Sequence, residues 1–273
     1  MMREALYTGR SDREVTMDTE KIIKEIKDLA LECGEILKKA DRSRINTDVK
    51  EGHANFVTEY DVLVQSRLQD GLLKILPEAR FFGEEGEHTA FPEAEWVFVV
   101  DPIDGTTNFM KGLNLSAIAI ALLHNKERLF SLVYNPFTDE MFTALKGRGA
   151  RLNGKTISVS DEPLERGIVL FGTSPYYEDL PKKAFDTAFS YMDKCIDVRR
   201  LGSAELDLCY VACGRAELYF EPLIQPWDYA AGSLIVEEAG GTVSRWDGTP
   251  FDITKACSCV AKGKNAVWTE QDI

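Results

Sequence analysis

The residues best suited to chemistry lie in the segment Asp101-Pro102-Ile103-Asp104-Gly105-Thr106. It directly follows an apolar run, Trp96–Val100, which predicts a buried strand. Gly105 permits a tight turn, and Gly105 to Phe109 is expected to begin a short helix whose free N–H groups can bind an anion. The two carboxylates alone would repel a phosphate. Mg²⁺ between them would attract it, because this hard cation takes oxygen ligands and bridges to phosphate oxygens.

Electrostatics separates such a metal site from an ordinary turn. Two like charges ~4 Å apart repel by about 4 kcal/mol at a near-surface effective dielectric constant. Gathered carboxylates therefore protonate or splay apart unless cations are bound. The alternative is a plain turn, since Asp, Pro and Gly are all turn formers. The whole string following a buried strand favours the site, because α/β proteins usually place ligands at the C-terminal ends of strands.

Helices and strands that would position this segment are predicted on both sides of it. Apolar residues at helical spacing predict helices over 18–40, 64–76, 181–194, 203–213 and 228–239. Ser203 is a suitable N-cap for the fourth of these helices. Apolar or alternating runs predict further strands over 115–123, 129–134, 140–145, 168–171, 198–201 and 216–220.

The order of these elements predicts how the chain is organised. Residues 1–16 are polar and are expected to form a flexible N-terminal extension. Residues 17–160 would form an N-terminal half that is rich in antiparallel strands. Residues 161–273 would form a C-terminal half in which strands and helices alternate. No linker rich in Gly, Ser or Pro separates the halves, so we expect one packed body of mixed α and β layers.

Composition excludes several classes of function. The chain has 273 residues, with 32 Lys+Arg against 45 Asp+Glu and a net charge of −13. Without a basic run, this charge disfavours binding to nucleic acid or to an anionic membrane. No apolar stretch predicts a membrane span or a signal peptide, and the six cysteines form no disulfide framework, so we expect a cytoplasmic protein with reduced thiols. None of the three histidines has metal-ligand spacing.

Four motifs together resemble the inositol monophosphatase family. The segment 101–109 resembles its first signature, and 226–232, Pro-Trp-Asp-Tyr-Ala-Ala-Gly, resembles its second. Gly83-Glu84-Glu85 and Val57-Thr58-Glu59-Tyr60-Asp61 resemble two upstream elements, and the resemblance covers about residues 18–265. It implies an α+β fold built as a layered α/β/α/β/α sandwich, an Mg²⁺-dependent phosphomonoesterase with two or three ions per site, and a homodimer.

The resemblance also implies a set of metal ligands. Glu84, Asp101 and the carbonyl of Ile103 would hold a first Mg²⁺. Asp101, Asp104 and Asp228 would hold a second, with Asp101 shared between the two ions. Glu84 would also contribute to a weaker third ion. Lys50 and Asp61 match auxiliary positions near that weaker site.

The same resemblance assigns catalytic and substrate-binding positions. Glu84, Asp104 and Thr106 would be catalytic, with Glu84 and Thr106 orienting the attacking water. The amides of Gly105 and Thr106 would bind the phosphate. The residues expected to face the substrate are Asp104, Gly202, Ser203, Ala204, Glu221 and Asp228.

Departures from the family pattern leave the alcohol part of the substrate open. Met110-Lys111-Gly112-Leu113-Asn114 replaces the usual continuation of the first signature, and Asn55 and Glu205 are also atypical. The resemblance implies a small phosphorylated polyol as the substrate, above all inositol monophosphate, and sensitivity to Li⁺. Fructose 1,6-bisphosphate and nucleotide 3′-phosphates are alternatives on the same scaffold. A regulatory binding protein that retains the fold is a further alternative.

Overall fold

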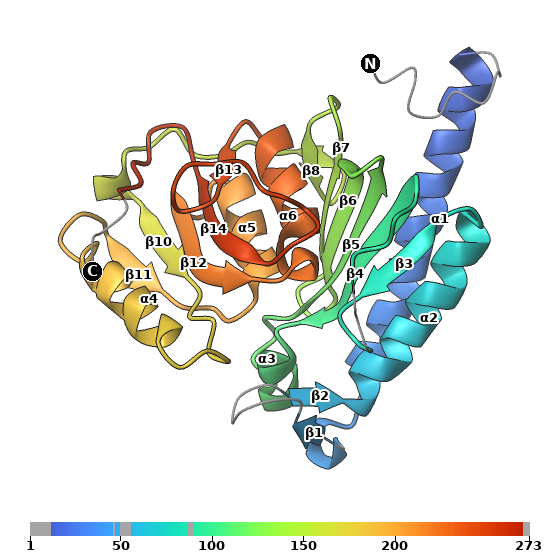
Figure 1. The fold of residues 1–273 in the computed structure, drawn as a ribbon, viewed down its shortest axis with the longest axis horizontal. Coiled ribbons are helices and arrows are strands. Elements are labelled where there is room, and N and C mark those ends of the chain that lie inside the picture. The colour runs from blue at the N-terminus through green and yellow to red at the C-terminus, as the bar shows by residue number, and fades with distance from the viewer. Residues whose placement is uncertain (1–11, 46, 50–55, 87–89, 270–273) are drawn as a thin grey trace.

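The computed structural model describes residues 12–45, 47–49, 56–86 and 90–269. Its larger sheet has the order β3-β4-β5-β6-β7-β8-β9, in which β3 and β4 are parallel and all other neighbours are antiparallel (Figure 1). These strands are β3 (Arg80–Gly83), β4 (Trp96–Asp104), β5 (Ala117–His124), β6 (Glu127–Asn135), β7 (Glu140–Leu145), β8 (Ala150–Leu152) and β9 (Lys155–Thr156). The antiparallel meander predicted from the sequence is therefore present.

A second sheet is formed by the C-terminal half. Its order is β11-β10-β12-β14-β13, and β10 lies parallel to both of its neighbours. These strands are β10 (Ile168–Phe171), β11 (Asp197–Arg199), β12 (Leu218–Ile224), β13 (Thr242–Ser244) and β14 (Cys257–Lys262). A separate hairpin pairs β1 (Thr47–Val49) with β2 (Phe56–Thr58).

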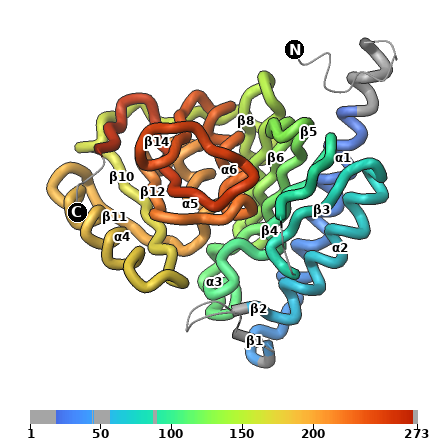
Figure 2. The backbone as a smooth tube through the Cα atoms, in the orientation of Figure 1, coloured from blue at the N-terminus to red at the C-terminus, as the bar shows by residue number. Residues whose placement is uncertain are grey.

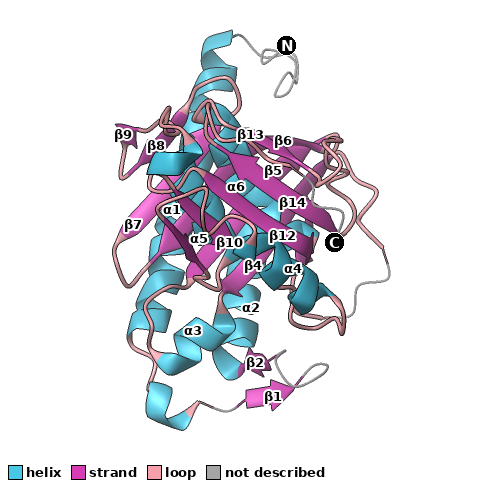
Figure 3. Ribbon diagram, turned by 90° about the vertical axis from the view of Figure 1, so that its left-hand side faces the viewer, coloured by secondary structure: helices cyan, strands magenta, loops and turns pink. Residues whose placement is uncertain are grey.

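Helices cover both faces of both sheets. They are α1 (Asp12–Lys38), α2 (Glu59–Ile75), α3 (Thr106–Lys111), α4 (Leu180–Phe189), α5 (Ala204–Ala212) and α6 (Pro226–Glu238), with 3₁₀ turns at Arg42–Arg44 and Leu164–Arg166. Helices α1 and α2 pack on one face of the larger sheet, α5 and α6 lie between the sheets, and α4 covers the far face of the smaller sheet (Figures 1 and 2). The expected layered sandwich is confirmed; Figure 3 views it from the left-hand side of Figure 1, so that the layers lie one behind another.

Strand β4 shows why the sequence builds these layers. Successive side chains of a strand point to opposite faces. Phe98 and Val100 belong to the apolar core under α1 and α2. Val97 and Val99 belong to the core shared with α5, α6 and the smaller sheet. A strand that is buried on both faces needs a continuous apolar run, which is the pattern the sequence shows.

Several helix boundaries differ from the sequence prediction; α2, for example, begins at Glu59 rather than at 64. Helix α1 begins at Asp12, within the segment 1–16 for which an extension was expected. Helix α4 ends at Phe189, five residues before the predicted end. The chain then turns so that Tyr191 is buried and its ring stacks on Trp268. No helix among the described residues combines the length and apolar character needed to cross a membrane.

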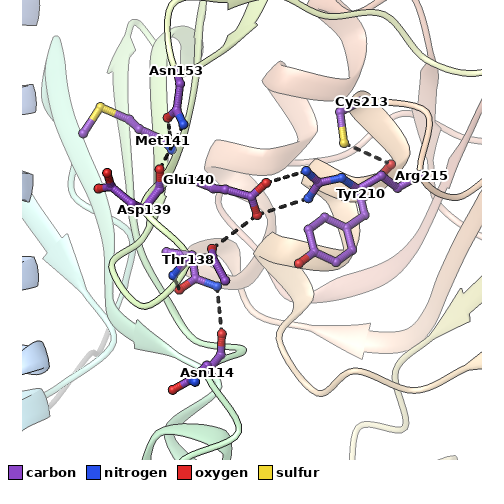
Figure 4. Close-up of polar contacts among 10 residues, drawn as sticks. Asn114, Thr138, Asp139, Glu140, Met141, Asn153, Tyr210, Cys213 and Arg215 are labelled. Atoms are coloured by element: carbon purple, nitrogen blue, oxygen red, sulfur yellow. Dashed lines mark hydrogen bonds and ion pairs between the residues drawn. The ribbon is translucent and has the colours of Figure 1, made fainter.

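An ion pair joins the larger sheet to the layer behind it (Figure 4). Glu140, the first residue of β7, accepts two hydrogen bonds from the guanidinium of Arg215, which follows α5. Thr138 also donates to Glu140, at 3.2 Å, and the guanidinium lies over the Tyr210 ring. The ion pair therefore links the turn after α5 to the start of β7.

Candidate active site

The end of β4 presents Asp101 and Asp104 as the sequence analysis expected. The ladder between β4 and β5 shifts register between these two residues, which leaves the chain free to turn. The Asp101 carboxylate accepts a hydrogen bond from the Ile103 amide at 2.9 Å and stabilises that turn. Gly105 has φ +85°, and a Cβ there would lie 2.9 Å from the Leu115 carbonyl oxygen, so only glycine fits before α3 begins.

Helix α5 points its N-terminus at Asp104. The Asp104 carboxylate accepts hydrogen bonds from the Ser203 hydroxyl at 2.5 Å, the Glu205 amide at 2.8 Å and the Ala204 amide at 3.2 Å. Ser203 also accepts from the Leu206 amide, which confirms the predicted N-cap. These donors stabilise a buried carboxylate that the strand alone leaves without partners.

Asp228 and Glu84 complete the acidic group from two other elements. Asp228 lies in the first turn of α6, where its carboxylate accepts from the Gln225 amide at 2.7 Å. Glu84 directly follows β3, and its amide donates to the Val100 carbonyl at 3.1 Å. With Asp101 and Asp104, both residues line one cavity of about 360 Å³. The structure therefore brings together four carboxylates from three separate segments: the end of β3, the end of β4 and the start of α6.

Burial and mutual repulsion raise the pKa values of these carboxyls. Burial, followed by the charges of Glu84 and Asp104, raises the pKa of Asp101 well above its usual value. Burial raises the pKa of Asp104 to about 6, although its hydrogen bonds from Ser203 and from α5 act in the opposite direction. The pKa of Asp228 is raised for the same reason, burial first and the charge of Glu84 second. Such a group takes up protons or cations.

Thr106 is held in place by Asp61. The Thr106 hydroxyl lies 3.0 Å from the Asp61 carboxylate and 3.1 Å from the carbonyl of Ile103, and it donates to one of them at a time. Asp61 is fully buried, accepts from both the amide and the hydroxyl of Thr58, and forms the capping box of α2. Burial raises the pKa of Asp61 to about 6. Lys50, the other auxiliary position, lies outside the described residues.

The residues expected to receive the alcohol line the same cavity. They are Gly202, Ser203, Ala204 and Glu221. The Glu221 carboxylate is 8% exposed and accepts from the Ser174 amide and the Tyr219 hydroxyl, both at 2.7 Å. Glu205 is buried behind Asp104, and its carboxylate accepts from the amides of Ala231 and Gly232 in α6. This atypical carboxylate therefore joins α5 to α6 and does not line the cavity.

The sequence analysis missed several residues that line the cavity, among them Arg200, Asp207 and Tyr176. Arg200 precedes α5, Asp207 lies one helical turn after Ser203, and Tyr176 lies in the loop after β10. Tyr176 is 54% exposed, yet burial of its hydroxyl and the nearby Asp228 charge raise its pKa. The i to i+4 spacing from Ser203 would have placed Asp207 on the site-facing side of its helix. No local signal marks Tyr176.

The donor set fits a hard divalent cation. Oxygen ligands surround the cavity, and Arg200 is the only Lys, Arg or His among the described residues that line it. In that part of the chain no three His, Cys, Asp or Glu side chains form a metal cage by themselves. Mg²⁺ does not require such a cage, because it usually binds one or two carboxylates and completes its octahedron with waters and substrate phosphate.

The chain is similar to known proteins in both sequence and fold. The inositol monophosphatase family model matches residues 18–272. The Nus factor SuhB of Vibrio cholerae serotype O1 is 38% identical over 200 residues, which cover 73% of this chain and 75% of that protein. Inositol monophosphatase 2 of Solanum lycopersicum is 37% identical over 248 residues, covering 85% and 91%. A solved IMPase/NADP phosphatase complexed with Mg²⁺ and phosphate superposes with a TM-score of 0.81 at 25% identity, over 90% of this chain and 92% of that one. The chain belongs to the inositol monophosphatase family.

Proposed function

We propose that this protein is an Mg²⁺-dependent phosphatase that hydrolyses the phosphate monoester of a small polyol, preferentially inositol monophosphate, to the alcohol and inorganic phosphate. One observation carries the proposal. Glu84, Asp101, Asp104 and Asp228 come from distant parts of the chain and line one cavity beside the start of α3. Their raised pKa values mean that the group gains free energy when cations bind.

The chain's own residues have separate roles in this proposal. Glu84, Asp101 and the Ile103 carbonyl would hold one Mg²⁺, and Asp101, Asp104 and Asp228 a second. Bound there, the ions would neutralise phosphate charge and lower the pKa of water. Glu84 and Thr106 orient the attacking water: when Thr106 donates its hydroxyl proton to Asp61, its oxygen lone pairs remain free to accept from that water.

In this proposal different residues bind the phosphate and the alcohol. Free amides of Gly105 and Thr106 face the phosphate, since the first N–H groups of a helix have no partner within it. Ser203, Ala204 and Glu221 face the alcohol. Arg200 is the only cation that lines the described cavity, which favours a single phosphate over a bisphosphate.

A phosphate-release screen tests the proposal. The panel contains inositol 1-phosphate, fructose 1,6-bisphosphate, a nucleotide 3′-phosphate and NADP, each with Mg²⁺ or with EDTA. We expect release that requires Mg²⁺, is fastest with the inositol ester and is reduced by millimolar Li⁺. A faster rate with another ester would transfer the substrate assignment to that ester.

The similarity to proteins named Nus factor SuhB favours a second candidate, a regulatory binding protein that retains the fold. Absence of Mg²⁺-dependent release from every ester would favour that candidate. The family resemblance also supports a cytoplasmic homodimer. Light scattering during gel filtration measures the oligomeric state directly, and a mass of one chain would contradict the dimer.

A further inference from the structure

Asp207 is a buried carboxylate with unused hydrogen-bonding capacity at the cavity. It is 1% exposed, and its backbone amide donates to the Ser203 carbonyl within α5. Its Oδ1 is a buried side-chain oxygen without a hydrogen-bond partner among the described residues. A buried carboxylate without a hydrogen-bond partner reduces the stability of the fold by roughly several kcal/mol. Such groups in folded proteins therefore almost always have a partner. Asp207 is also one of the residues that line the cavity.

The neighbouring carboxylates differ from Asp207 in this respect. Asp104 already accepts three hydrogen bonds from α5 and Ser203. Glu221 accepts from Ser174 on one oxygen and from Tyr219 on the other. Asp207 therefore differs from Asp104 and Glu221 in keeping a carboxylate oxygen without a hydrogen-bond partner among the described residues.

Arg200 defines the other side of this subsite. Its Nε donates to the Thr173 hydroxyl at 3.1 Å, and its Nη1 lies 3.6 Å from the position that a Cβ on Gly202 would occupy. The guanidinium can donate to the oxygen of one hydroxyl, and the carboxylate can accept from the hydrogen of a neighbouring hydroxyl. A second phosphate in this place would be repelled by Asp207.

We propose that Asp207 accepts a hydrogen bond from a hydroxyl group of the substrate alcohol and so selects phosphorylated polyols over phosphate esters that lack a hydroxyl there. The inference rests on the proposed function and adds a specificity-determining residue to it. A site built to bind a hydroxyl discriminates strongly against an analogue without one, because its own polar group is then left unpaired.

The test compares two esters in four proteins. Phosphate release from inositol 1-phosphate and from phenyl phosphate is measured with Mg²⁺ for the natural chain, Asp207→Leu, Asp207→Asn and the control Glu217→Gln. Glu217 is a buried carboxylate that accepts from the Ile168 amide away from the cavity. For Asp207→Leu we expect kcat/KM with the inositol ester to fall about tenfold or more, because KM increases. With phenyl phosphate we expect kcat/KM to stay within about twofold of the natural chain.

Asp207→Asn retains an acceptor oxygen, so it should keep part of the selectivity, and it preserves the test if the leucine variant does not fold. The control should shift thermal stability without changing the ratio of the two kcat/KM values. Equal losses on both esters, or no loss on either, would overturn the role of Asp207 while leaving the phosphatase intact. An inactive natural chain would instead overturn the proposed function, and this inference with it.

Discussion

Ser203 donates a hydrogen bond to the Asp104 carboxylate at 2.5 Å, although the two residues lie 99 positions apart. Asp104 ends the strand that carries the first signature, and Ser203 caps a helix of the C-terminal half. Both residues are buried, so the bond is shielded from water. The acidic centre is therefore held together by packing between the halves of the chain.

Replacing Ser203 by alanine tests this link. Ser203→Ala removes the hydroxyl bond to Asp104 and the cap of α5, and loss of a cap alone typically costs about 1 kcal/mol. We expect a loss of about 1–3 kcal/mol in the free energy of unfolding, together with a weaker apparent affinity for Mg²⁺. Urea unfolding and Mg²⁺ titration of the activity measure the two effects. Ser203→Thr keeps the hydroxyl and should restore most of both; failure to do so would point to packing instead.

Asp104→Asn separates chemistry from folding. The amide is nearly isosteric but removes a negative charge from the cation site. We expect Mg²⁺-dependent phosphate release to fall by several orders of magnitude while the circular dichroism spectrum is unchanged. Two opposing effects act on thermal stability without metal: repulsion with Asp101 and Glu84 is relieved, but the Asn amide nitrogen cannot accept from an α5 amide as the carboxylate does. Activity close to that of the natural chain would remove Asp104 from the mechanism.

The ion pair of Glu140 and Arg215 is expected to contribute to stability but not to catalysis. Arg215 is 43% exposed and Glu140 16%, and neither lines the cavity. Solvent screening limits such a pair, so a double-mutant cycle with Glu140→Ala and Arg215→Ala should give a coupling energy of about 1 kcal/mol or less. Denaturant unfolding of the four proteins gives this value. A large loss of kcat in either single variant would show that the pair positions α5 for catalysis.

Sequence reasoning identified the elements around the site because each carries a local signal. The strand before Asp101 is a continuous apolar run, and Ser203 precedes an apolar helix as an N-cap should. The order of the strands has no such signal. Pairing of β12 with β14, for example, depends on packing of the whole smaller sheet.

The same contrast applies within the cavity. The resemblance located the residues that the structure gathers there, but it was silent on Asp207, Arg200 and Tyr176. Asp207 lies in a largely apolar helix, and its burial became visible only when α5 was seen packed between the sheets. Tyr176 belongs to a loop with no motif, and its place beside the acidic group depends on how β10 directs the chain.

Stability without metal should decrease as the pH rises. Burial raises the pKa of Asp61 and of Asp104 from the usual 3.8 to about 6. Between these values the folded chain binds more protons than the unfolded chain, so the free energy of unfolding falls with increasing pH. Asp101 and Asp228, whose pKa values are raised well above 3.8, extend the decrease to higher pH.

Bound Mg²⁺ should cancel this decrease, because the ionised carboxylates then have a cationic partner. At a free concentration 100 times the dissociation constant, Mg²⁺ would add about 2.7 kcal/mol to the free energy of unfolding. Urea unfolding at pH 5 and at pH 7.5, each with EDTA or with Mg²⁺, measures both effects. Asp104→Asn is the matched control and should show a shallower pH dependence in EDTA. If Mg²⁺ stabilises the natural chain and Asp104→Asn equally at pH 7.5, the cation binds elsewhere and this acidic group is not its site.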